Sequence, residues 1–172
     1  MLLRGINVSG HRKVPMKELK TLLESTRFEK VQTYIQSGNV TFESDENAEQ
    51  LQKIAETSIK EHFGFVVKCL VLTADEFVHV FNQHPYYKQG LPEEKLYYTL
   101  LFDAPSPEKI LLLKEVKAAG EHFQLKEKTL YFYYENGYGN AKISNPIVEQ
   151  KLKVFATTRN WKTMKTLVEM TI

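Results

Sequence analysis

The sequence predicts an α+β protein of two tandem ferredoxin-like units, each a split βαβ arrangement with an antiparallel sheet. Hydrophobic residues make up 42% and charged residues 26% of the 172 residues, which is typical of a globular protein and excludes disordered and collagen-like classes. Strand and helix patterns follow the order β-α-β-β-α-β over residues 2–72. The same order begins again at residue 96 and ends in an extra C-terminal helix, so the repeat is one of pattern.

The first unit opens with a strand at residues 2–8 and a polar loop. Pro15 then starts a helix at a position where its missing N–H is tolerated. Apolar residues recur at helical spacing through this segment: Met16, Leu19, Leu22 and Leu23. Residues 31–36 and 39–43 are rich in β-forming side chains, and Ser37-Gly38 between them predicts a hairpin turn.

A second helix and a fourth strand complete this unit. Asn47 and Gln50 have the spacing of a capping box, and Gly64 provides a left-handed helix stop. Residues 65–72 form a largely apolar strand. Thr73 and Glu76 then cap a short connecting helix, and Pro85, Gly90 and Pro92 mark residues 84–94 as a linker.

The second unit repeats the order with different residues. Its predicted elements are strands at 96–102, 122–125 and 129–134, helices opened by Ser106-Pro107 and Asn145-Pro146, a vestigial strand at 154–157 and a last helix capped by Asn160. Val148, Leu152 and Phe155 are expected to face inward. The predicted domains are residues 1–83, including the connecting helix, and 95–172, including the C-terminal helix, joined by the linker 84–94.

Composition narrows the functional classes. The single Cys69 cannot form an internal disulfide and lies in an apolar strand, so we expect an inert thiol and a cytoplasmic protein. No apolar run is long enough to span a membrane, and the first residues lack a signal-peptide pattern. The histidines show no metal-ligand spacing, so no metal or cofactor is expected. No catalytic motif is present, and the sequence reveals no reaction.

Polar loops of the first unit are the first candidate site. In the split βαβ topology, the loop after the first strand and the turn of the hairpin lie at the same end of the sheet. This end collects Asn7, Ser9, Gly10, Arg12 and Lys13 with Gln36, Ser37, Gly38 and Asn39. Beside the start of the first helix, such loops favour a phosphate or carboxylate. Alternatively, they are ordinary turns in which Gly and Asn serve only the backbone geometry.

The second unit contributes two further candidates. Residues 136–142 contain two glycines before Lys142, a pattern that can form an oxyanion nest but also suits a plain loop. Arg159, before the last helix, can bind a carboxylate or phosphate with two hydrogen bonds. Residues 1–30 hold seven Lys/Arg against three Asp/Glu, and residues 142–172 hold six against two. Each end therefore has a net charge of +4, which favours an anion if the two ends meet.

Strand tyrosines offer a different interpretation. Exposed aromatic side chains on such a sheet can stack nucleic-acid bases, and the predicted strands carry Tyr97, Tyr98, Tyr131, Tyr133 and Tyr134. The basic-glycine-aromatic signature of RNA-binding strands is absent. Aromatic residues on strands also form core and cross-strand pairs, and both interpretations stay open.

Four stretches resemble a known family. They are Leu3-Arg4-Gly5-Ile6-Asn7-Val8, Val14-Pro15-Met16, Thr33-Tyr34-Ile35-Gln36-Ser37-Gly38-Asn39-Val40 and Thr157-Thr158-Arg159-Asn160-Trp161. The sequence is similar to the bacterial family called domain of unknown function 1697. The chain departs from the family pattern at Ser9, where members normally have glycine. The resemblance implies an α+β fold and no particular activity.

Together these observations lead to one main hypothesis and two alternatives. We expect a small anionic ligand, a nucleotide or phosphorylated metabolite, to bind between the two units. Arg4, Asn7, Ser37 and Asn39 would form one wall, and Lys142, Arg159 and Asn160 would close the site from the second unit. The alternatives are a nucleic-acid-binding module and a protein-interaction module without a ligand, as a monomer or a homodimer formed through a sheet edge.

Overall fold

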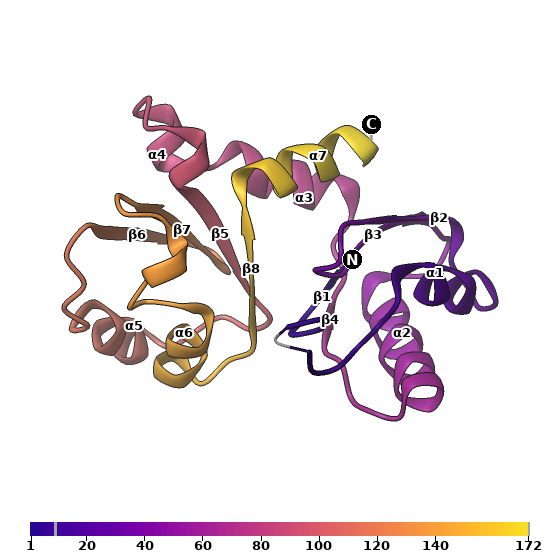
Figure 1. Cartoon of the computed structure of the whole chain (residues 1–172). Helices are drawn as coiled ribbons and strands as arrows, with labels where there is room; N and C mark the ends of the chain where they lie inside the picture. Colours follow the sequence, from indigo (N-terminus) through magenta and orange to yellow (C-terminus); the bar gives the residue numbers. More distant parts are fainter. Residues whose placement is uncertain (9, 172) are drawn as a thin grey trace. The chain divides into compact units, whose positions relative to one another are not determined.

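A computed structural model describes residues 1–8 and 10–171 (Figure 1). Ser9, one of the expected loop residues, lies outside the described residues. The chain folds into two compact units, Met1–Phe77 with Leu167–Ile172 and Val78–Thr166. Each contains a four-stranded antiparallel sheet with helices on one face, which confirms the predicted fold class. The sequence-based limits of 1–83, 84–94 and 95–172 stay a prediction about domains.

The first sheet has the strand order β2-β3-β1-β4, and every neighbouring pair is antiparallel. Its strands are β1 (Leu2–Leu3), β2 (Glu29–Tyr34), β3 (Asn39–Glu43) and β4 (Cys69–Leu70). The helices α1 (Met16–Glu24) and α2 (Ala48–Phe63) cover one face (Figure 1). Strand β1 pairs with β3 on one side and β4 on the other, so the β2–β3 hairpin lies beside β1.

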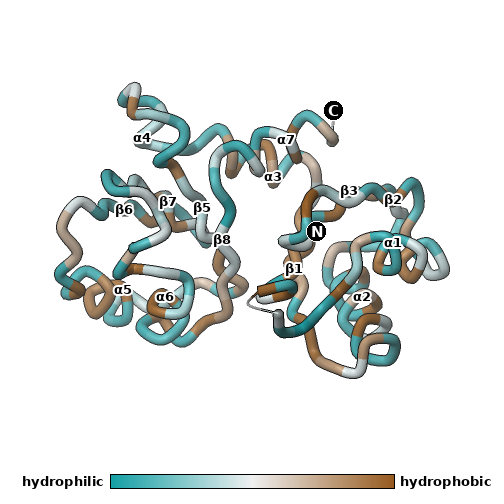
Figure 2. Tube along the Cα trace, in the orientation of Figure 1, coloured by the Kyte–Doolittle hydropathy of each residue, from teal (hydrophilic) through white to brown (hydrophobic). Residues whose placement is uncertain are grey.

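The helices pack on this sheet through their apolar faces. Polar and apolar segments alternate along α1 and α2 (Figure 2), as expected for amphipathic helices. Leu19 and Leu23 of α1 and Ala55 and Ile59 of α2 are fully buried in one core. The Oδ1 atom of Asn47 accepts a hydrogen bond from Gln50 N at 2.9 Å and caps α2, as predicted.

Two strands of the first unit are shorter than the sequence predicted. The strand expected at residues 2–8 ends at Leu3, because Gly5 (φ 65°) and Asn7 (φ 53°) adopt left-handed conformations that no strand accommodates. The strand expected at 65–72 is reduced to Cys69–Leu70. It is followed by α3 (Ala74–Asn82), which the predicted capping box of Thr73 and Glu76 opens.

The second sheet has the order β6-β7-β5-β8, which repeats the topology of the first. Its strands are β5 (Leu96–Leu101), β6 (Glu121–Lys126), β7 (Thr129–Tyr134) and β8 (Ala156–Asn160). Helices α5 (Pro107–Lys114) and α6 (Asn145–Leu152) pack on one face, and η2 (Tyr138–Asn140) lies between β7 and α6 (Figure 1). The last helix is α7 (Trp161–Thr171).

Two local expectations for this unit were wrong. The vestigial strand is a full strand, β8, which pairs with β5 along five residues. Phe155 does not face inward, since 45% of its surface is exposed. Residues 84–94, predicted as a linker, contain α4 (Pro85–Lys88) and η1 (Glu93–Lys95), and His84 and Tyr86 within them are buried.

Candidate functional site

The two polar loops of the first unit meet, as the topology predicted. The Asn7 side-chain amide donates to Val14 O at 2.9 Å and to Gln36 O at 2.8 Å. Its Oδ1 atom accepts a hydrogen bond from Val14 N at 2.9 Å. Asn7 therefore ties the loop after β1 both to the start of α1 and to the hairpin turn.

The hairpin turn is held by a second asparagine. Asn39 is fully buried, and its amide donates to Tyr34 O at 2.9 Å and to Ser37 Oγ at 3.0 Å. Gly38 has φ +80°, and a Cβ atom there would lie 2.7 Å from Leu3 Cβ. The distinctive residues of this loop therefore shape the turn, as the structural interpretation of the motif expects.

Arg4 leaves β1 beside this turn. Its main-chain N–H donates to Lys68 O at 2.9 Å, and the residue is partly buried. Within the first unit, the structure thus gathers Asn7, Ser37 and Asn39 at one end of the sheet, with Arg4 on the segment that enters it.

In the second unit, Arg159 lies inside strand β8 rather than in the predicted loop before α7. Its side chain is only 7% exposed. One guanidinium nitrogen, Nη1, donates to Thr157 Oγ1 at 2.7 Å and to Thr158 O at 2.8 Å. Burial lowers the pKa of Arg159 to about 10, because removing the group from water disfavours its charged form.

The other two predicted residues of this unit have different surroundings. Asn160 caps α7, since its Oδ1 atom accepts a hydrogen bond from Thr163 N at 2.8 Å. Lys142 is held through its main-chain N–H, which donates to Glu121 Oε1 at 2.7 Å. The next residue, Ile143, packs in the core of this unit with Val148 and Leu152 of α6.

The strand tyrosines are largely interior. Tyr98, Tyr131 and Tyr134 are buried, and the Tyr98 and Tyr131 hydroxyls donate to Phe81 O and Val80 O. These three rings cannot stack a nucleic-acid base without leaving their packed positions, which favours the core interpretation of the tyrosines.

Sequence reasoning missed His84, the group against which Tyr98 and Tyr131 pack. His84 is 1% exposed, and its ring centroid lies 4.7 Å from that of Tyr98 and 5.8 Å from that of Trp161. Its Nε2 atom donates to Tyr97 O at 3.3 Å, while Nδ1 has no hydrogen-bond partner among the described residues. Burial lowers the pKa of His84 to about 4, so the imidazole is neutral near pH 7. Pro85 favours a linker when the sequence alone is considered, so the buried position of His84 was not predicted.

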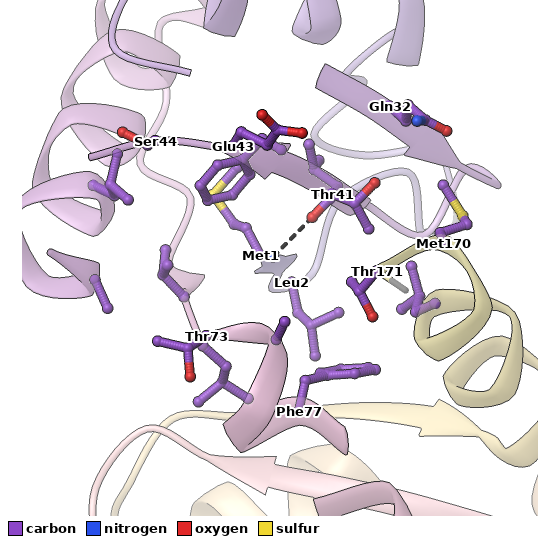
Figure 3. A pocket seen from close by; sticks show the side chains of 18 of the residues that line it. Met1, Leu2, Gln32, Thr41, Glu43, Ser44, Thr73, Phe77, Met170 and Thr171 are labelled. Carbon is purple, nitrogen blue, oxygen red and sulfur yellow. Dashed lines mark hydrogen bonds between the residues drawn. The ribbon is translucent and has the colours of Figure 1, made fainter. Parts of the chain in front are cut away.

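A cavity of about 670 Å³ lies in the first unit, beside β3 and the ends of α3 and α7 (Figure 3). None of the seven predicted ligand-binding residues lines it. A smaller cavity of about 190 Å³ in the second unit is lined by His79, Gln83, Lys126, Glu127 and Tyr131.

Side chains that could ligate a metal are dispersed over the described part of the chain. Within residues 1–8 and 10–171 there is no group of three or more His, Cys, Asp or Glu side chains arranged to hold a metal ion. Cys69 is fully buried, and burial raises the pKa of its thiol to about 12, as expected for a cysteine in an apolar strand. None of the described helices combines the length and apolar character needed to cross a bilayer.

The fold defines an α+β protein of two ferredoxin-like units. The chain belongs to the family described as protein of unknown function (DUF1697), whose sequence model matches residues 1–131. Its structure is similar to that of the conserved bacterial protein SP0830 from Streptococcus pneumoniae, with a TM-score of 0.76 and 23% sequence identity over 99% of this chain and 96% of that one. At this identity the likeness shows the fold alone. No curated protein matches the sequence.

Proposed function

We propose that the protein binds a small anionic ligand, such as a nucleotide or a phosphorylated metabolite, and that Arg159 attracts it. The observation that supports this proposal is the desolvated guanidinium of Arg159, whose surface is 7% exposed and whose pKa falls to about 10. The hydroxyl of Thr157 and the carbonyl of Thr158 accept hydrogen bonds from Nη1 and orient the guanidinium. A guanidinium can bind a carboxylate or phosphate with two parallel hydrogen bonds, and such bonds are stronger where water is excluded.

The other predicted residues take different roles in this proposal. The amides of Asn7 and Asn39 and the cap at Asn160 already bind main-chain or neighbouring groups, so they keep the loops and α7 in shape. Arg4, Ser37 and Lys142 stay predicted ligand contacts.

Calorimetric titration tests the proposal. The wild type is titrated with ATP, GMP and inorganic phosphate at fixed ionic strength, beside Arg159→Lys and the control Arg27→Lys, at an exposed arginine outside the candidate loops. We expect at least one anion to bind saturably, and Arg159→Lys to weaken it about tenfold because an ammonium cannot form the bidentate contact. Equal binding by both variants, or no binding to the wild type at millimolar anion, would overturn the proposal.

A further inference from the structure

The small cavity of the second unit lies between the end of α3 and the turn that joins β6 to β7. Its volume is about 190 Å³, and the residues that line it are His79, Gln83, Lys126, Glu127 and Tyr131. Tyr131 is only 2% exposed and provides the buried part of the lining, whereas the other four residues are partly or fully exposed. A small ligand can therefore contact an aromatic ring and polar side chains at the same time.

The ammonium group of Lys126 brings a positive charge to this cavity. Its Nζ atom donates to Gln83 O at 3.0 Å and to Gln83 Oε1 at 3.5 Å, and it lies 5.9 Å from the centroid of the Tyr131 ring. All of these partners are uncharged, and Lys126 forms no ion pair with a carboxylate in the described part of the chain. An ammonium has three N–H donors, so one is left for an anionic group.

The carboxylate of Glu127 brings the opposite charge. Its Oε1 atom lies 3.9 Å from Nε2 of His79, which is too far for a hydrogen bond, and 77% of its side chain is exposed. Burial, and then the negative charge of Glu127, raises the pKa of Tyr131, so this carboxylate is close to the tyrosine ring. Lys126 and Glu127 thus hold a cation and an anion at one cavity without pairing with each other.

Size and charge together favour a small ligand that carries both charges. The cavity is smaller than the roughly 300–1,000 Å³ in which drug-sized ligands bind, so a nucleotide does not fit. A simple anion would be attracted by Lys126 but repelled by Glu127, and a simple cation would meet the reverse. A molecule with a carboxylate beside an ammonium gains both attractions, and its ammonium can also lie against the face of the Tyr131 ring.

We infer that this cavity binds a free α-amino acid with a small side chain. The ligand carboxylate accepts a hydrogen bond from Lys126 Nζ, and the ligand ammonium donates to the carboxylate of Glu127. Gln83 Oε1, at 3.5 Å from Lys126 Nζ, offers this ammonium a second acceptor. Arg159 does not line the cavity, so the inference is independent of the proposed function.

NMR titration of the whole chain tests the inference, with L-alanine as the probe. Acetate and methylammonium, which each carry one of the two charges of alanine, are compared with it at the same ionic strength. We expect alanine to shift the main-chain amide resonances of Lys126 and Glu127 saturably, and each singly charged ion to bind at least tenfold more weakly. No saturable shift with alanine, or a preference of less than tenfold over either ion, would overturn the inference.

Variants of the β6–β7 turn separate the two charges. Glu127→Gln keeps the shape of this exposed side chain and removes its charge, so it should weaken alanine binding at least tenfold and bind acetate more tightly than the wild type does. Lys126→Met should also weaken alanine binding, whereas Lys128→Met, at the exposed lysine of the same turn, should bind like the wild type.

Two results with these variants would contradict the inference. One is alanine binding that is unchanged in Glu127→Gln, and the other is binding that Lys128→Met weakens as much as Lys126→Met does. If Lys126→Met does not fold, the comparison of Glu127→Gln with the wild type still decides.

Discussion

Replacing His84 with phenylalanine should remove part of the loss of stability that the protein suffers in acid. His84 is buried and its pKa falls from 6.5 to about 4 on folding. The unfolded chain therefore binds a proton below about pH 6.5 that the folded chain refuses until about pH 4, and the free energy of unfolding decreases as the pH falls through this range. A phenylalanine ring occupies a similar place in the aromatic cluster and cannot be protonated.

The magnitude follows from the two pKa values. Each pKa unit corresponds to about 1.4 kcal/mol, so the full effect is about 3 kcal/mol, of which about 2 kcal/mol appears between about pH 7.5 and pH 5. The assay is urea unfolding at several pH values for the wild type, for His84→Phe and for the control His11→Gln, whose side chain is exposed.

The comparison of slopes isolates the contribution of His84, because each variant differs from the wild type at one histidine only. We expect the free energy of unfolding to fall by about 2 kcal/mol less for His84→Phe than for the wild type over this interval, and the control to follow the wild type. Parallel curves for the wild type and His84→Phe would refute the argument that burial keeps this imidazole neutral.

Three further predictions concern single positions. In chemical denaturation, Gly38→Ala should destabilise the protein by about 1–3 kcal/mol more than Gly5→Ala. Both glycines have positive φ, but only at Gly38 would a Cβ atom lie 2.7 Å from Leu3 Cβ. Equal losses of stability would contradict the packing argument. Asn160→Ala should lower the free energy of unfolding by about 1 kcal/mol through the lost cap of α7, and an unchanged urea midpoint would show that the cap does not matter. Cys69 should react with a thiol reagent at pH 8 only on unfolding, since burial raises its pKa to about 12; rapid reaction of the native protein would contradict this.

Periodicity and caps were enough to predict the topology of both units. Helical spacing located α1 and α2, and the capping side chains of Asn47 and Thr73 marked true helix starts. The topology then predicted that the loop after β1 meets the hairpin turn, which the bond from Asn7 to Gln36 confirms. These features depend on local sequence or on connectivity, so they can be deduced from the chain alone.

What was missed depends on tertiary packing. Arg159 was assigned to a loop because Asn160-Trp161 marks a helix start, whereas pairing with β5 makes its segment a strand. Ile35 has φ +49°, a conformation that a β-branched residue rarely adopts and that no sequence pattern indicates. The large cavity is lined by several distant segments, so no local signal points to it.

The most direct test of the account follows the side-chain Nε–Hε resonance of Arg159 by NMR while inorganic phosphate is added, with Arg159→Lys used to assign the signal. We expect a saturable chemical-shift change of this resonance, larger than that of the exposed Arg27, because an anion binds the buried guanidinium. A resonance for Arg159 that stays unchanged while phosphate shifts only exposed groups such as Arg27 would contradict the proposed function.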